Sequence, residues 1–221
     1  MELQRNYMVT PRWNFAWRIS LRFVHWWAGL ITLALIGLMM LTNARPQAVE
    51  VVLPIMIGIH AAFAFAPEDE PALELLTAAP RPLAWLLAER LALVAGVQLT
   101  AAVIGTFLIA LTGAPRWDYL LLGWLSPAAA MMGFSVYASL ALRRFSHGVL
   151  AAVMLYGGML LGGDLLVGRF PFLMPLHLFL QPSSVSPGDY LLNRVVLMIV
   201  GALLLMRAFR FVRREDKVLG L

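Results

Sequence analysis

The sequence predicts an all-α integral membrane protein with six transmembrane helices and both termini in the cytoplasm. Three observations lead to this fold class. Of the 221 residues, 61% are hydrophobic and 13% are charged, with a mean hydropathy of +0.80, whereas soluble domains contain about 45–50% apolar and about 25% charged residues. Six apolar segments approach the length of about 20 residues that a membrane-spanning helix needs. Arginine and lysine are concentrated in alternate connections between these segments.

The six predicted spans differ in length and in the residues at their ends. They are residues 23–41, 49–65, 91–111, 119–142, 147–167 and 190–209. The second span is the shortest, and Glu50 at its start indicates a helix end at the membrane interface. The first span follows a basic stretch, but it is too long for the core of a secretory signal and no A-x-A cleavage site follows it. We therefore expect it to remain in the protein.

The basic residues predict the orientation of these spans. With the N-terminus inside, thirteen arginines and lysines lie on the cytoplasmic side and four lie outside, which accounts for all 17: the outer four are Arg45, Arg116, Arg169 and Arg194. Cytoplasmic connections of membrane proteins hold such an excess. We expect a multi-pass protein of a prokaryotic cell membrane, in contact with membrane lipids. The net charge of +5 fits this orientation better than nucleic-acid binding, which we do not expect.

A single membrane domain over residues 1–221 is expected, since no long linker or low-complexity tract divides the chain. Residues 1–22 are expected to form an interfacial helix that leads into the first span, with Thr10 as its N-cap and Pro11 as its first helical residue. Residues 207–221 form a basic tail that is expected to lie on anionic lipid headgroups.

The connection at residues 168–189 is unusually apolar for a loop. Large apolar side chains alternate with prolines along it: Phe170, Pro171, Phe172, Leu173, Met174, Pro175, Leu176, Leu178, Phe179, Leu180 and Pro182. Irregular backbone is tolerated at membrane depth only where protein buries it. We expect either a broken, re-entrant helix that dips into the outer leaflet or an apolar loop packed against the top of the bundle.

The cytoplasmic connection at residues 66–82, A-P-E-D-E-P-A-L-E-L-L-T-A-A-P-R-P, combines acidic residues with leucines. Three acids precede Pro71, which is typical of the first turn of a helix, and Leu73 and Leu76 then share one face before Pro80 ends the helix. A helix of about two turns is too short to be stable alone in water. Anionic headgroups would repel its carboxylates. We therefore expect a protein partner that offers a groove and basic residues.

At these residues the chain resembles the membrane subunits of ABC transporters of the ABC-2 (type V exporter) kind. Those subunits carry an acidic run, then L-E-x-L-L, then a proline between their second and third spans. The matching positions here are Glu68, Asp69, Glu70, Leu73, Glu74, Leu75, Leu76 and Pro80. Six spans, cytoplasmic termini, an N-terminal interfacial helix and a long apolar loop before the sixth span are also similar to that family.

The resemblance implies a permease subunit that pairs with a second permease subunit, identical or paralogous, and with two nucleotide-binding ATPase subunits. Residues 68–80 would be the coupling helix, ATP and Mg²⁺ would bind the partner ATPase, and the exported substrate would be lipid-like, peptide or otherwise amphipathic. The basic tail would then offer a second contact with the ATPase. The chain has no G-x-x-x-x-G-K-[ST] motif and its only lysine is Lys217, so we expect no enzymatic activity and no cofactor on this chain.

Polar and small residues inside the spans supply further candidates. Asp164, near the outer end of the fifth span, is a candidate for transport or gating, because an ionisable residue in a span is expensive to bury. The alternative is a structural ion pair with Arg169 or Arg194. Gly158 and Gly162 form a small-x-x-x-small pair that allows close helix approach, either within the bundle or at a subunit interface.

Three histidines support a rival function. His25, His60 and His147 are predicted near the cytoplasmic ends of their spans, so two of them could share one depth, as a b-type haem requires. The rival is a haem-related membrane protein, either a redox protein that uses His25 and His60 or a haem-exporter subunit, which the L-E-x-L-L-x-x-P pattern also resembles. A third possibility is a scaffolding membrane subunit that transports nothing.

Overall fold

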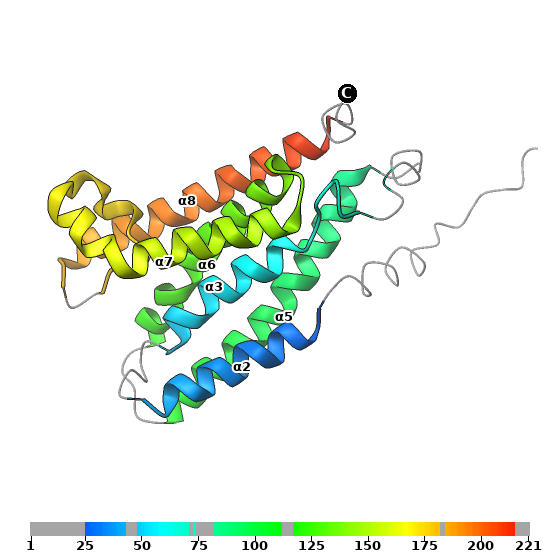
Figure 1. Cartoon of the computed structure of the whole chain (residues 1–221). Helices are drawn as coiled ribbons and strands as arrows, with labels where there is room; N and C mark the ends of the chain where they lie inside the picture. Colours follow the sequence, from blue (N-terminus) through cyan, green and yellow to red (C-terminus); the bar gives the residue numbers. More distant parts are fainter. Residues whose placement is uncertain are drawn as a thin grey trace, which may run out of the picture.

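In the part of the chain that the structure describes, all regular secondary structure is helical. The computed structural model describes residues 25–42, 48–70, 73, 82–111, 117–181 and 184–214, with the backbone alone at 117–121. The helices are α2 (Trp27–Met40), α3 (Ala48–Ala62), α5 (Leu83–Leu111), α6 (Trp117–Ala141), α7 (Phe145–Arg169), the short 3-10 helix η2 (Pro171–Leu176) and α8 (Pro187–Val212). The α-helices lie side by side in an elongated bundle (Figure 1).

Each of the six predicted spans coincides with one of these α-helices. Three of them, α5, α7 and α8, are long and apolar enough to cross a membrane, whereas α2 and α3 are apolar but shorter. At 1.5 Å per residue, the 14 residues of α2 extend over about 21 Å, against a hydrocarbon core of about 30 Å. Helix α5 begins at Leu83, eight residues before the predicted start at Leu91, because the turn that contains Trp85 and Arg90 continues the same helix.

Helix α6 lies at the centre of the packing. It contacts α3, α7 and α8, while α2 packs on α5 and α3. The closest approach is between α6 and α8, at Gly133 and Gly201. A Cβ on Gly201 would lie 2.5 Å from the carbonyl oxygen of Ala129, so only glycine allows the two backbones to meet there.

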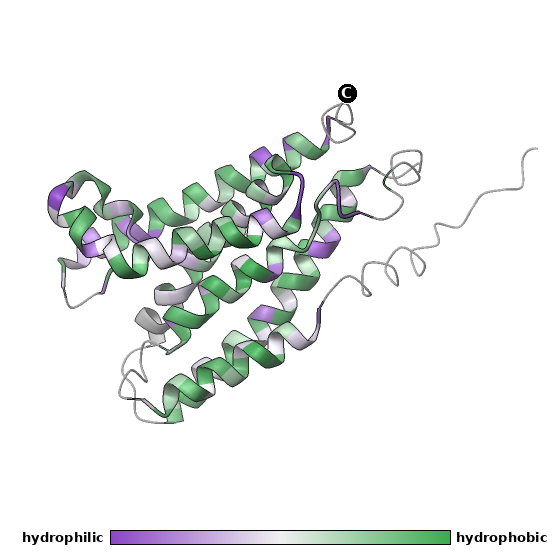
Figure 2. Ribbon diagram, viewed as in Figure 1, coloured by the Kyte–Doolittle hydropathy of each residue, from purple (hydrophilic) through white to green (hydrophobic). Residues whose placement is uncertain are grey.

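The outer surface of the bundle is largely apolar. Hydrophobic residues follow the helices along most of their length, and hydrophilic residues gather mainly at helix ends and connections (Figure 2). The side chains of Leu161 and Leu165 on α7 are 86% and 78% exposed. Soluble monomers rarely expose apolar surface on this scale. The helix lengths and this surface together indicate a membrane protein.

The connection between α6 and α7 is short and positions the candidate site. Arg143 lies in it with φ +66°, the left-handed conformation that ends many helices. This conformation costs a non-glycine residue roughly 1–2 kcal/mol. It turns the chain so that α7 begins at Phe145, and it brings the Arg143 carbonyl oxygen to the backbone N–H of Glu68, which donates to it at 2.9 Å.

Candidate functional site

The residues that follow α3, here called the acidic loop (residues 66–70), lie against the turn between α6 and α7. Besides the backbone bond from Glu68 to Arg143, the Asp69 N–H donates to the carbonyl oxygen of Ala66 at 3.1 Å. Ala66 and Pro67 are buried, whereas Glu68 and Asp69 are exposed. The acidic loop is therefore a docked turn with two carboxylates at its surface.

Glu68 is bound by both arginines of the α6–α7 turn. The Arg144 Nε donates to its carboxylate at 2.5 Å and the Arg143 Nε lies 3.4 Å from it. The hydrogen bond from Arg144, together with the charges of both arginines, lowers the pKa of Glu68 below its ordinary value. The same contact raises the pKa of Arg144. The pair is solvent-exposed, so its contribution to stability is small.

Asp69 caps α7 from another part of the chain. Its Oδ2 accepts a hydrogen bond of 2.7 Å from the backbone N–H of Phe145, the first residue of α7, while the N-cap residue Arg144 makes no side-chain capping bond of its own. A negative charge at a helix N-terminus interacts favourably with the helix dipole. Asp69 thus joins the end of the acidic loop to the start of α7.

Glu70 forms a buried two-pronged ion pair with Arg90 of α5. The Arg90 NH1 and NH2 groups donate to the two carboxylate oxygens at 2.5 and 2.8 Å, and the side chains of Arg90 and Glu70 are 1% and 5% exposed. NH1 also donates to the carbonyl oxygen of Ala64 at 3.1 Å. Removing one partner from such a pair leaves an uncompensated buried charge.

The sequence interpretation looked for basic partners of these carboxylates in another protein, whereas the structure supplies donors from the same chain. The acidic residues and their arginines share one end of the bundle, a proximity that the spacing in sequence does not reveal. Of the remaining predicted coupling residues, Leu73 packs against the core cluster that contains Leu87 and Leu140. Glu74, Leu75, Leu76 and Pro80 lie outside the described residues.

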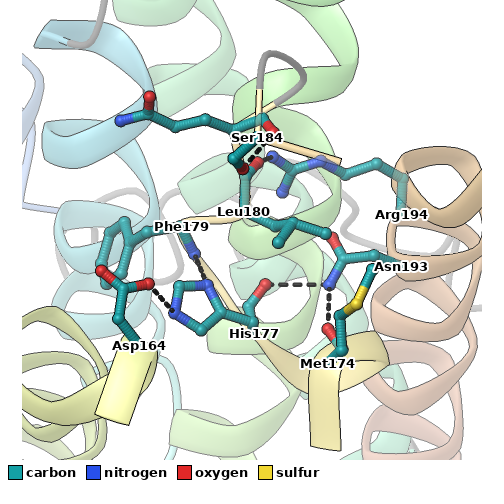
Figure 3. A network of polar contacts seen from close by, with 9 residues as sticks. Asp164, Met174, His177, Phe179, Leu180, Ser184, Asn193 and Arg194 are labelled. Atoms are coloured by element: carbon teal, nitrogen blue, oxygen red, sulfur yellow. Dashed lines mark hydrogen bonds and ion pairs between the residues drawn. The ribbon is translucent and has the colours of Figure 1, made fainter. Parts of the chain in front are cut away.

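A second polar cluster, here called the α7–α8 network, consists of Asp164, His177, Asn193 and Arg194 (Figure 3). The predicted ion-pair partners of Asp164 were Arg169 and Arg194, and this was wrong. The residue that contacts the Asp164 carboxylate is His177, whose Nε2 lies 3.3 Å from Oδ1. The reason is tertiary: the segment after η2 folds back against α7 and brings a buried imidazole to Asp164.

Asn193 and Arg194 of α8 hold the backbone of the folded-back segment. Asn193 Nδ2 donates to the carbonyl oxygens of Met174 and His177 at 3.0 and 2.9 Å. The Arg194 guanidinium donates to the carbonyl oxygens of residues 178 and 180 at 3.3 and 2.8 Å. Leu178 packs among residues of α6, α7 and α8. Buried irregular backbone needs such donors, and this packing is compatible with both expected arrangements, the re-entrant helix and the apolar loop packed against the bundle.

The glycine pair predicted for packing within the bundle does not pack there. A Cβ on Gly158 or Gly162 would meet no atom within 4 Å, whereas one on Gly163 would lie 2.5 Å from His177 Nε2. Helix α7 directs Gly163 toward the folded-back segment, whereas Gly158 and Gly162 point away from that segment. Gly133 and Gly201 make the close helix contact that the sequence analysis missed. Ala129 and Gly133 do have small-x-x-x-small spacing, whereas no such spacing marks Gly201.

The predicted histidines have different surroundings. His60 is 2% exposed, and its Nδ1 lies 3.2 Å from Nε2 of Gln98. His25 packs on the ring of Phe63 with 5.1 Å between ring centroids. His147 is exposed and its Nδ1 lies 3.3 Å from the carbonyl oxygen of Leu142. Among the residues that the structure describes, no three histidines or acids are placed to hold a metal ion together.

Glu50 is a further acid, partly buried, that the sequence analysis treated only as a helix end. Its carboxylate lies against Gly123 of α6, where any larger residue would overlap with it, and its charge interacts with that of Arg194. A glutamate in the first turn of an apolar helix, with an arginine in a later span, is the only signal the sequence offers for this contact.

Comparisons of the chain with models of known protein families, with curated protein sequences and with solved structures find no match. The class that the fold defines is a helical membrane protein, because the part of the chain that the structure describes contains three helices long and apolar enough to cross a membrane.

Proposed function

We propose that this chain is the permease subunit of an ATP-driven transporter of the ABC-2 kind, an exporter of a lipid-like, peptide or amphipathic substrate. In this proposal α2, α3, α5, α6, α7 and α8 are the six spans and both termini are cytoplasmic. A second permease subunit and two nucleotide-binding ATPase subunits complete the transporter. The resemblance of residues 68–80 to the coupling segment of that family supports the proposal.

One structural observation carries the mechanism: the acidic loop is attached to two other helices besides α3, which precedes it. Glu70 is bound to Arg90 of α5 through two short charge-assisted hydrogen bonds, and Asp69 is bound to the first residue of α7. Charge-assisted bonds of this kind are both stronger and more directional than neutral ones. A force applied to the segment that follows would therefore act on α3, α5 and α7 together.

This arrangement divides the predicted coupling residues by role. Because Glu70 and Asp69 are bonded within the chain, we assign them to transmission of movement into the bundle. The contact with the ATPase is assigned to Glu74, Leu75 and Leu76, since Leu73 packs against the core of this chain. Nucleotide hydrolysis takes place on the ATPase, since this chain lacks a phosphate-binding loop with its lysine.

The following experiment distinguishes residues that contact the ATPase from residues that transmit movement into the bundle. The tagged full-length chain is purified from membranes of its native host, and any ATPase subunit that accompanies it is identified. Glu74→Lys is expected to abolish ATPase co-purification with normal membrane insertion, whereas Glu2→Lys, another predicted cytoplasmic charge reversal, is expected to leave it intact. Glu70→Gln is expected to retain the ATPase but to uncouple its hydrolysis from substrate. Absence of any ATPase from the wild-type preparation, or full retention by Glu74→Lys, contradicts the proposal.

A further inference from the structure

Three polar side chains from three helices form a chain of contacts inside the bundle. Thr32 of α2, Gln98 of α5 and His60 of α3 are each no more than 2% exposed. The Thr32 hydroxyl lies 3.0 Å from Gln98 Oε1, and Gln98 Nε2 lies 3.2 Å from His60 Nδ1. Buried polar groups are expensive unless each finds a partner. At the far end of the chain, His60 Nε2 is buried and has no hydrogen-bond partner among the described residues.

The protons of the three side chains, Thr32, Gln98 and His60, can be arranged in two ways. The Thr32 hydroxyl carries one proton but faces two acceptors, Gln98 Oε1 and the Ala28 carbonyl oxygen at 2.8 Å. If it donates to Gln98, the amide N–H donates to His60 Nδ1 and the imidazole proton stays on Nε2. If it donates to Ala28, the amide is flipped, its N–H₂ donates to Thr32, and its oxygen accepts from His60 Nδ1–H. The orientation of an amide follows from such a network rather than from its shape.

The second arrangement leaves His60 Nε2 with an unshared electron pair. It satisfies the Thr32, Gln98 and Nδ1 donors at once, whereas the first buries an N–H that has no acceptor. A histidine whose one nitrogen donates to an oxygen, with its other nitrogen left as a base, is the state in which histidine binds metals. Gln98 would fix this tautomer.

A second imidazole, that of His25, lies in the same region as His60. His25 precedes α2, and its ring contacts Phe63, whose backbone N–H donates to the His60 carbonyl oxygen at 3.3 Å. The two imidazoles are near enough to interact electrostatically. The Nδ1 of His25 is also buried and also has no hydrogen-bond partner among the described residues. The contacts of this ring with Trp27 and Phe63 are aromatic.

We infer that His25 and His60 bind a late first-row transition-metal cation through His25 Nδ1 and His60 Nε2. Imidazole nitrogen suits copper, nickel and zinc, whereas calcium and magnesium prefer oxygen ligands. Glu70, an acid in the loop that follows α3, is already bound by Arg90. With two neutral protein ligands and water in the remaining positions, the ion is exchangeable. This inference stands independently of the proposed transport function.

The test uses the full-length chain in detergent, purified without a histidine tag, and titrated with Cu²⁺ or Zn²⁺. Retained metal is measured after gel filtration, and Cu²⁺ quenching of tryptophan fluorescence gives the affinity, since Trp27 contacts the His25 ring at 5.3 Å between centroids. We expect about one ion per chain. His25→Ala and His60→Ala should each weaken binding at least about tenfold, and Gln98→Leu should do so within the range of about 10- to 100-fold typical of outer-shell changes.

The controls distinguish a metal site from a structural network. His147→Ala removes an exposed histidine and should leave the affinity unchanged. Nitrogen-15 NMR of labelled histidine should show the His60 proton on Nδ1 in the metal-free protein, and this readout does not depend on whether the alanine variants fold. In a second experiment, the protein is titrated with haemin in place of the metal ion. A Soret band that depends on both histidines, together with no binding of the bare ion, overturns the inference. So does a His60 proton that resides on Nε2, or metal binding that survives both substitutions.

Discussion

At the scale of single residues, the Glu70–Arg90 pair shows how a charge can be placed at the end of an apolar helix. Arg90 was counted in the sequence only as one more cytoplasmic charge. In the fold it is buried, and its guanidinium donates to a carboxylate twenty residues earlier and to the carbonyl oxygen of Ala64, just before the acidic loop. An arginine in this setting depends on its acid, because the desolvation cost of the charge is met only while both partners are present.

We predict that Glu70→Gln lowers the stability of the protein by about 3–5 kcal/mol, because it leaves the buried Arg90 charge without compensation. The measurement is the midpoint of thermal unfolding in detergent. Glu68→Gln, whose partners are partly or fully exposed, serves as the matched control and should leave the stability nearly unchanged. Equal effects of the two substitutions would contradict the assignment of Glu70 as the anchor.

Glu68 should titrate below the ordinary value of 4.5 for a glutamate, because Arg144 donates to its charged form. Since the folded pKa is lower than the unfolded one, the contact stabilises the docked loop above about pH 4.5. That stabilisation is lost as the pH falls through the folded pKa. A carboxyl-carbon NMR titration would measure the value. Arg144→Gln should raise it, whereas Arg207→Gln should leave it unchanged; a normal pKa in the unaltered protein would refute the contact.

At the scale of elements, the segment between η2 and α8 illustrates how irregular backbone is buried. Two consecutive side chains of α8, Asn193 and Arg194, donate to four carbonyl oxygens of residues 174–180. Consecutive residues of a helix point in different directions, so each reaches a different part of the segment. The apolar side chains of the segment explain why it is buried. The donors of Asn193 and Arg194 satisfy backbone carbonyl groups that would otherwise be buried without a hydrogen bond.

We predict that Asn193→Leu loosens this segment. The chain has no cysteine, so a single Leu178→Cys, at a position that is 4% exposed, reports on its opening. Two unsatisfied carbonyl groups cost about 1–3 kcal/mol each, so maleimide labelling at this position should accelerate by about tenfold or more. Leu161→Cys, already exposed, should react at an unchanged rate. Unaltered labelling at position 178 would show that Asn193 does not hold the segment.

The contact between α6 and α8 depends on a backbone approach that only glycine permits. Gly201→Val is expected to destabilise the protein by more than about 1–3 kcal/mol, the usual cost of overpacking, because the new Cβ would overlap with the backbone of Ala129. Gly157→Val is the control, since that position is open within the chain. Thermal unfolding of the two variants in detergent tests the contrast, and a tolerant position 201 would refute it.

At the scale of the whole molecule, the orientation in the membrane is the main untested expectation. We predict that Ser184→Cys is labelled by a membrane-impermeant maleimide in intact cells, because it lies in the connection assigned to the outside. Arg213→Cys, exposed at the end of α8, should react only after the membrane is permeabilised. The reverse pattern, or labelling of both positions in intact cells, would contradict six spans with a cytoplasmic C-terminus.

Much of the fold could be predicted because apolar length is a local property. Each predicted span became a helix, and the apolar connection before α8 packs against the bundle, as both expected alternatives require. The partners of Asp164 and of the acidic loop could not be predicted. His177 follows η2, Arg143 and Arg144 lie in the α6–α7 turn, and Arg90 lies on α5. The choice among several arginines and histidines therefore depends on how distant elements pack against one another. For the same reason, the close contacts of Gly133, Gly163 and Gly201 with other elements could not be predicted.

The amino-acid sequence by itself determined that the chain is helical, that its helices are apolar on the outside as well as the inside, and where those helices lie. These properties follow from composition and from the lengths of apolar runs. Only the tertiary structure decided which charges are shared within the chain and which backbone groups they satisfy. The acids that resemble a docking motif are bonded to α5 and α7, because packing brings donors to them that are distant in sequence.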